Sequence, residues 1–500
     1  MKVKIRRWGI NGEGIAYVNK KAIFVEGAIP GEVVDIIIDE DKGTYATGHI
    51  NRILESAPRR REPICPHWQT CGGCSLMHVD YKGQIRMKEH AIEEALRRYA
   101  DYSGKIEPMI KNPDPLGYRN ACKLPFGLDE EGKTTTGMFK KGSNEFVPLD
   151  RCIIHSKKLE HVRAALMPLI QQAGLKPFTK DHPEGLMTLV LKEFDGKVHV
   201  VFVTTEMEIP QSLVDQILET IPETASVWQS IKEPDDPGYE LFGQKVLHLG
   251  GDMKMTLQLD DFALDLLPKS FFQLNTRQAV NLYKTIASWI PPHSDFLVEA
   301  YSGIGAISLF VADKADKVLG IEYIEDAVAN ANENALINGK ENVSFICGDA
   351  GQEMTKLEKS KIDTLIVDPP RSGLNTQMKE AILKSEPKTL IYVSCNPSTL
   401  GKDLAVLQSK YEIERVQPFD FFSQTPHVET ACLLKLKAPE DFTPVNLERE
   451  KPTRPKTGGP ADRNNRRPAG KDNRRPGRKD NYHSAGKKPY PPRNRSPKAR

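Results

Sequence analysis

The sequence contains no long hydrophobic run and few cysteines for its length. None of its apolar stretches approaches the roughly 18 residues of a membrane helix, and no apolar segment follows its charged start at residues 1–4. These absences predict a chain without a membrane span or a secretory signal. Eight cysteines in 500 residues are typical of reduced thiols or metal ligands rather than of a disulfide scaffold. We therefore expect a cytoplasmic protein.

Charge is distributed unevenly, although the formal net charge is only +3. Residues 451–500 hold 17 Lys and Arg against 3 Asp, so they carry +14 and the rest of the chain carries −11. The end of the chain is also rich in proline and poor in large apolar side chains, which predicts a disordered basic tail over residues 439–500. Such a tail is typical of proteins that meet nucleic acid, although it can also serve only to solubilise.

Periodicity and composition divide the remainder into three predicted domains of the α/β class. Short strand-like runs between glycines in residues 1–57 predict a small OB-like β-barrel, with a nucleic-acid-binding or a purely structural role. Residues 58–265 predict a mixed α/β middle domain that includes an amphipathic helix over 82–100. Residues 266–438 alternate strands and helices regularly, which predicts a Rossmann-like domain with a parallel sheet.

Four cysteines form the candidate metal site. Cys65, Cys71 and Cys74 have the spacing C-x5-C-x2-C, and Cys152 is a candidate fourth ligand. Four thiolates can hold a [4Fe–4S] cluster, and the spacing alone fits structural zinc equally well.

A glycine turn and two acids form the candidate cofactor site. The predicted strand 296–300 runs into a Gly-x-Gly turn at 303–305, and the next strand ends in Glu322. An acid about 20 residues after such a turn can bind the ribose hydroxyls of a nucleoside cofactor. Asp349, after strand 343–346, suits the adenine end. Because the third glycine of a dinucleotide fingerprint is absent, the pattern favours S-adenosylmethionine over NAD.

A thiol and two carboxylates follow or precede predicted buried strands. Cys395 comes at the end of strand 390–394, Asp368 at the end of strand 365–367, and Glu429 just before the final apolar strand. Ligands of open α/β sheets bind at the carboxyl ends of the strands. A lone cysteine there is more often packing, but the two acids beside it predict a catalytic site.

Taken together, these residues resemble the RumA/RlmD type of RNA (uracil-5-)-methyltransferase, which is related to the tRNA enzymes. The resemblance covers residues 1–437 and includes an N-terminal TRAM domain. The matching motifs are the four cysteines, Ser270-Phe271-Phe272-Gln273-Leu274-Asn275, Asp368-Pro369-Pro370-Arg371-Ser372-Gly373-Leu374, Ser394-Cys395-Asn396-Pro397 and His427-Val428-Glu429-Thr430. Ser302 and Ala306 depart from residues that relatives often carry in the first glycine loop.

The resemblance implies roles for the matching residues. The four cysteines would hold a [4Fe–4S] cluster, Cys395 would be the nucleophile, and Glu429 would accept the proton. Gln273, Tyr301, Glu322 and Asp368 match positions for S-adenosylmethionine and substrate.

The expected activity is methylation of uridine C5 in 23S rRNA by a monomeric enzyme, with tRNA as the alternative substrate. Radical S-adenosylmethionine chemistry would require C-x3-C-x2-C, which the chain lacks. A non-catalytic RNA-binding module would not need Cys395 and Glu429.

Overall fold

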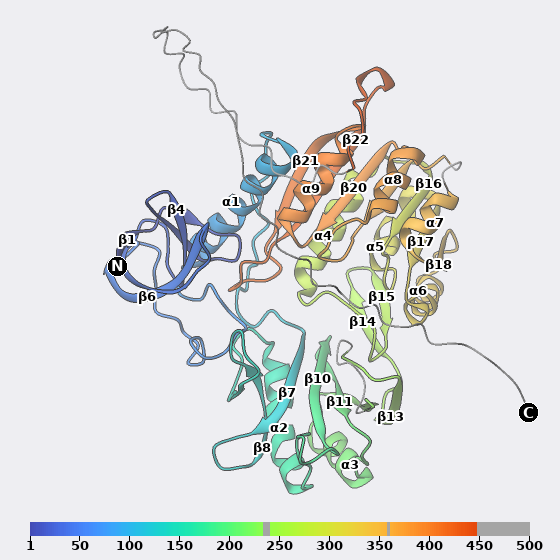
Figure 1. The fold of residues 1–500 in the computed structure, drawn as a ribbon. Coiled ribbons are helices and arrows are strands. Elements are labelled where there is room, and N and C mark those ends of the chain that lie inside the picture. Colours follow the sequence, from blue (N-terminus) through green and yellow to red (C-terminus); the bar gives the residue numbers. More distant parts are fainter. Residues whose placement is uncertain (234–240, 358–360, 448–500) are drawn as a thin grey trace, which may run out of the picture. The chain divides into compact units, whose positions relative to one another are not determined.

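The computed structural model describes residues 1–233, 241–357 and 361–447, so most of the predicted basic tail lies outside the described residues. The described part contains three sheets of six, seven and seven strands and one two-stranded hairpin (Figure 1). Within these residues, no helix is both long and apolar enough to cross a membrane. Residues 439–447, at the start of the predicted tail, pack near the last sheet, where the Thr443 amide donates to the Ser409 carbonyl at 2.9 Å.

The first sheet is built from short strands in the order β1-β5-β6-β4-β3-β2. One segment, residues 2–8, supplies both outer strands, which closes the sheet around a small apolar core. Its strands are β1 (Lys2–Lys4), β2 (Arg7–Trp8), β3 (Gly14–Val18), β4 (Lys21–Glu26), β5 (Val33–Asp41) and β6 (Tyr45–Glu55). The predicted short strands are confirmed.

The second sheet has the order β13-β12-β11-β10-β7-β8-β9. Alternation along its central strands places Val200 and Phe202 in one apolar cluster and Val201 and Val203 in another. Helices α2 (Lys157–Gln172) and α3 (Gln211–Thr220) cover the first of these faces. The strands are β7 (Ala121–Leu128), β8 (Thr134–Phe139), β9 (Phe146–Pro148), β10 (Leu186–Phe194), β11 (Lys197–Thr204), β12 (Thr224–Ile231) and β13 (Lys245–Gly251).

The third sheet has the order β18-β17-β16-β19-β20-β22-β21. The first five strands are parallel, and β22 runs antiparallel to both of its neighbours, β20 and β21. The regular alternation of strands and helices that the sequence predicts is confirmed. Its strands are β16 (Ser294–Ala300), β17 (Ala315–Glu322), β18 (Val343–Cys347), β19 (Thr364–Val367), β20 (Thr389–Ser394), β21 (Tyr411–Phe419) and β22 (Glu429–Leu436). Its helices are α5 (Ala306–Val311), α6 (Glu325–Ile337), α7 (Ala350–Lys356), α8 (Thr376–Ser385) and α9 (Pro397–Leu407).

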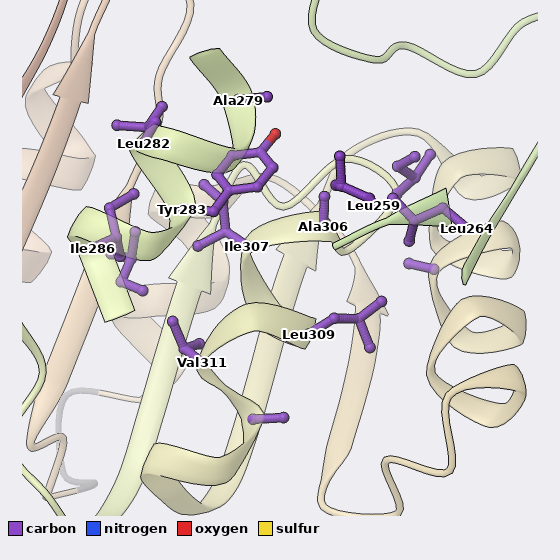
Figure 2. Close-up of a cluster of buried hydrophobic side chains, with 14 of the residues drawn as sticks. Leu259, Leu264, Ala279, Leu282, Tyr283, Ile286, Ala306, Ile307, Leu309 and Val311 are labelled. Atoms are coloured by element: carbon purple, nitrogen blue, oxygen red, sulfur yellow. The ribbon is translucent and has the colours of Figure 1, made fainter. Parts of the chain in front are cut away.

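Two apolar layers cover the third sheet, one on each face. Helices α4 (Thr276–Trp289), α5 and α6 and the hairpin β14 (Met255–Leu259)–β15 (Phe262–Leu266) form one layer with Leu297, Ile366 and Ile391. Figure 2 shows part of this layer, with side chains of α4, α5 and the hairpin drawn together. Helices α1 (Tyr81–Ala100), α7, α8 and α9 form the other layer.

Helix α1 therefore packs on the third sheet, although it lies early in the chain. The predicted amphipathic helix over 82–100 is confirmed, and its buried residues Ile85, Ile92 and Leu96 share a cluster with residues of α9. The two helices approach closely at Gly401, where a Cβ atom would come within 2.8 Å of the Ala95 carbonyl oxygen. A glycine is required there because any side chain would separate the helices.

The strand order reverses between β16 and β19. Strands β17 and β18 extend from β16 in one direction, and β19 and β20 extend in the other. Open α/β sheets bind their ligands at such a switch point, beyond the carboxyl ends of the strands. These strand ends carry Tyr301, Glu322, Asp368 and Cys395.

Candidate active site

The loop after β16 has an unusual backbone conformation. Tyr301, Gly303 and Gly305 have φ values of +68°, +55° and +82°. At Gly305 a Cβ atom would lie 2.5 Å from the Phe345 ring, whereas at Gly303 it would meet nothing within 4 Å. Gly305 therefore permits close packing, and Gly303 leaves room for a ligand against the backbone. A tyrosine in the left-handed region is uncommon and is typical of functional loops.

Glu322 is held in place at the end of β17. Its carboxylate accepts hydrogen bonds from the backbone amides of Gly303 at 3.0 Å, Tyr323 at 2.8 Å and Ile324 at 2.9 Å. These bonds fix the acid against the glycine loop, as the predicted ribose contact requires.

The other predicted cofactor residues come from different segments of the chain. Asp349 caps α7 by accepting from the Gln352 amide at 3.0 Å. Burial, then the negative charge of Asp349, raises the pKa of Tyr301 to about 12. Gln273 lies in the segment before α4, and its carbonyl accepts from the Asn120 amide side chain at 2.9 Å.

The structure places Cys395, Asp368 and Glu429 at adjoining strand ends, since β20 pairs with β19 on one side and with β22 on the other. Burial, then the carboxylate of Glu429, raises the pKa of the half-buried Cys395 thiol to about 11. Burial, then Asp368, raises the pKa of Glu429 well above its usual value. Burial also raises the pKa of Asp368, to about 7. The site therefore holds a thiol and two carboxyls that each resist ionisation.

Arg371 provides the positive charge in this cluster. Its guanidinium lowers the pKa of both the Cys395 thiol and the Glu429 carboxyl, which opposes the effect of burial. Its carbonyl accepts from the Asn396 amide side chain at 3.1 Å, so the loop after β19 is tied to the residue after the thiol. Arg371 belongs to one of the matching sequence motifs, but its role beside the thiol came only from the structure.

Two further ionisable groups in the cluster were not predicted. Glu299, in β16, is 1% exposed and accepts from the Ser308 hydroxyl. Burial raises the pKa of Glu299 to about 8, and the charge of Asp368 adds to this effect. Tyr283, in α4, is buried beside the same acids, and burial followed by Asp368 raises its pKa far above the usual value. The one available sequence signal for Glu299 was an acid inside the otherwise apolar run 296–300.

The four predicted metal-binding cysteines line a single cavity of about 450 Å³. Burial, then the nearby thiolates of Cys152, Cys71 and Cys65, raises the pKa of Cys74 to about 12. Nowhere in residues 1–233, 241–357 and 361–447 do three or more His, Cys, Asp or Glu side chains meet closely enough to hold a single metal ion. The predicted iron–sulfur cluster of the middle domain is therefore not supported by the described residues.

Similarity to known proteins identifies the family of the chain. Residues 1–50 match the TRAM domain, and residues 252–437 match the tRNA (Uracil-5-)-methyltransferase family. An uncharacterised RNA methyltransferase of Bacillus anthracis is 33% identical over 87% of this chain and 96% of its own length. One from Listeria monocytogenes is 34% identical over 87% and 96%. The chain belongs to the RNA (uracil-5-)-methyltransferase family.

A solved structure supports the same assignment of this methyltransferase. The tRNA (uracil-54, C5)-methyltransferase of Pyrococcus abyssi, in complex with S-adenosyl-L-homocysteine, is 26% identical over 87% of this chain and 99% of its own, with a TM-score of 0.70. The predictions of a methyltransferase fold with an N-terminal TRAM domain and of an S-adenosylmethionine-dependent RNA methyltransferase are confirmed.

Proposed function

We propose that this methyltransferase forms 5-methyluridine in 23S rRNA through a covalent bond between Cys395 and C6 of the target uracil. The observation that carries the proposal is the meeting of one thiol with two carboxyls at adjoining strand ends, beside the glycine loop. A uracil at this position has to leave its stack, because its ring must reach the thiol and the methyl donor together.

Cys395 starts the reaction. Uracil C5 is a poor nucleophile, and addition of the thiolate to C6 turns C5 into an enolate carbon that can attack. The thiol must lose its proton first, and the nearby guanidinium of Arg371 stabilises the thiolate against the effect of burial. Asp368 orients the uracil edge through a hydrogen bond.

Glu429 completes the reaction. After methyl transfer, C5 carries both the methyl group and its original hydrogen. The Glu429 carboxylate takes this proton, the C–H electron pair forms the C5–C6 double bond, and the bond between C6 and sulfur breaks. A base with a raised pKa accepts the proton more readily once it is ionised, and such general base catalysis contributes about 10²–10⁴-fold.

The cofactor would be held by the loop after β16 and the neighbouring strand ends. S-adenosylmethionine supplies an electrophilic methyl group on a sulfonium. Glu322 would bind the ribose hydroxyls, Asp349 the adenine end, and Gln273, Tyr301 and Asp368 the remaining contacts. The open space at Gly303 supports this placement.

We also propose that Cys65, Cys71, Cys74 and Cys152 hold a [4Fe–4S] cluster. The support is that the four thiols line one cavity. Because the methyl transfer involves no electron transfer, we expect such a cluster to be structural. It would cross-link segments that are distant in sequence.

Two RNA substrates are considered for this methyltransferase, 23S rRNA and tRNA. The cysteine set and the TRAM domain favour 23S rRNA, and the similarity to the tRNA enzyme of Pyrococcus abyssi favours tRNA. Mass spectrometry of nucleosides from separated 23S rRNA and tRNA of a deletion strain tests both. We expect 5-methyluridine to fall in 23S rRNA and to return with the wild-type gene but not with Cys395→Ala. Loss confined to tRNA would assign tRNA as the substrate.

The working enzyme is proposed to be a cytoplasmic monomer.

A further inference from the structure

The proposed base stands at the end of a turn that is anchored from outside its own sheet. Residues 420–428 connect β21 to β22, and Phe419 pairs directly with Glu429 across the two strands. Within the described part of the chain, the Glu429 carboxyl takes part in no hydrogen bond, although it is only 4% exposed. Its position is therefore set by its backbone, which pairs with β21 on one side and continues directly from the turn 420–428.

The first anchor is a buried ion pair between Lys88 of α1 and Asp420. Both side chains are 0% exposed, and Nζ lies 2.5 Å from Oδ1. The same Nζ donates to the Phe422 carbonyl at 3.0 Å. The other carboxylate oxygen of Asp420 accepts from the hydroxyls of Tyr81 at 2.8 Å and Ser423 at 2.6 Å. Buried pairs are weak contributors to stability, because desolvation offsets their attraction, so this pair is better explained as fixing a geometry.

The second anchor is Gln424, in the middle of the turn. It is 1% exposed and has φ of +70°, a conformation that a glutamine rarely adopts. Its backbone amide donates to Gln84 Oε1 at 2.9 Å, and its own Oε1 accepts from Gln84 Nε2 at 2.9 Å. Arg61 donates to the same oxygen at 3.2 Å. Strain of this kind persists only where the surroundings determine the backbone, and it concentrates at functional sites.

We propose that Lys88 and Gln424 are positioning residues for removal of the C5 proton. They hold the turn so that the Glu429 carboxyl faces the Cys395 adduct, and neither touches the reacting atoms. The inference rests on the proposed role of Glu429. It goes beyond that role, because it assigns control of the last step to residues on α1 and in the turn. Addition of the thiol and methyl transfer depend on β19 and β20 and remain available when the turn loosens.

Two variants separate this role from simple stabilisation. Gln424→Asn keeps a residue that tolerates positive φ but shortens the side chain away from Gln84. The double variant Lys88→Met with Asp420→Asn removes the ion pair and leaves no unpaired buried charge. Lys82→Met is the matched control, since Lys82 is an exposed lysine on the same helix.

The measurement follows radioactive methyl from S-adenosylmethionine into unmodified RNA in a single turnover, with adduct and released RNA separated on a denaturing gel. We expect methyl transfer within about threefold of wild type, release slowed about tenfold to a hundredfold, and a shifted RNA–protein band. Lys82→Met should show none of these changes. Melting temperatures confirm that the variants are folded.

Two outcomes would overturn the inference. Only the second would also overturn the proposed role of Glu429 as the base. If Glu429→Gln accumulates adduct and neither anchor variant does, only the positioning role fails. If Glu429→Gln itself gives no adduct, the base assignment fails and the positioning role fails with it.

Discussion

The Arg371 guanidinium lies 2.7 Å from the His427 imidazole, measured from Nη2 to Nδ1. This contact joins the loop after β19 to the turn before β22, beside the Cys395 thiol. Burial, then the charge of Arg371, lowers the pKa of His427 to about 4, so the imidazole is neutral at physiological pH. Among the described residues, Arg371 forms no salt bridge with a carboxylate, which leaves its charge available to a thiolate.

Replacing Arg371 should therefore change the pH dependence of the reaction. Arg371→Met removes the charge that lowers the pKa of Cys395, so that pKa should rise above about 11. We expect single-turnover methyl transfer to fall about tenfold or more at pH 7 and to recover partly as pH rises. Arg371→Lys should retain part of the activity. A pH profile unchanged in shape would contradict the role of Arg371.

Cys395→Ala should abolish methyl transfer while S-adenosylmethionine still binds, because the thiol adds to uracil and does not hold the cofactor. Radioactive methyl incorporation into unmodified rRNA and calorimetric titration of the cofactor measure the two effects. Ser398→Ala is the control. Ser398 donates to the Asn396 side chain through its backbone amide, and the substitution keeps this hydrogen bond. Residual activity within tenfold of wild type would rule out the nucleophile assignment.

Glu429→Gln should stall the enzyme as a covalent RNA–protein adduct. The amide cannot accept the C5 proton, whereas addition and methyl transfer remain possible. A denaturing gel with labelled RNA should show a shifted band that Cys395→Ala lacks. Loss of activity without the band would point to another base.

Glu299 should make the protein less stable as pH rises. Its folded pKa of about 8 lies above its unfolded value of 4.5, so the folded state binds more protons between these pH values. The free energy of unfolding should therefore decrease with pH across that window, by up to about 1.4 kcal/mol per pH unit from this group. Glu299→Gln should flatten the decrease in melting temperature between pH 5 and 8. An equal slope in both proteins would show that Glu299 is ionised in the folded state.

Protein purified without air should contain iron held by the four cysteines. We expect a brown protein with iron and sulfide in equal amounts, and loss of both in Cys71→Ser. The exposed Cys347 gives the control, since Cys347→Ser should keep the iron. Stoichiometric zinc without iron would decide for the zinc alternative.

The sequence predicted most of the third sheet because its signals are local. Buried strands such as 365–367 and 390–394 are short, mostly apolar runs, and each is followed within three residues by a proline, which cannot continue the strand ladder. Parallel strands present their carboxyl ends at one edge, so the strand pattern alone places Asp368 and Cys395 together. Glu322 could be placed by its distance along the chain from the glycine turn.

Contacts between distant segments were not accessible in this way. Packing of α1 against α9 and the bonds of Gln424 to Gln84 and Arg61 join residues more than 300 positions apart. The sequence around Gln424, Gln84 and Arg61 carries no pattern that identifies these residues as partners, since a single buried hydrogen bond leaves no periodicity in a sequence.

The amino-acid sequence by itself determined the sheet, the glycine turn and the three reactive groups, because periodicity and strand endings are properties of neighbouring residues. Only the tertiary structure decided their ionisation. Burial raises the pKa values of Cys395, Asp368 and Glu429, and repulsion by neighbouring carboxylates raises those of Cys395 and Glu429 further; these effects depend on distances between strands that are far apart in the chain. The charge of Arg371 acts on the thiol for the same reason, since an opposite charge shifts a pKa most strongly from within about 4–6 Å.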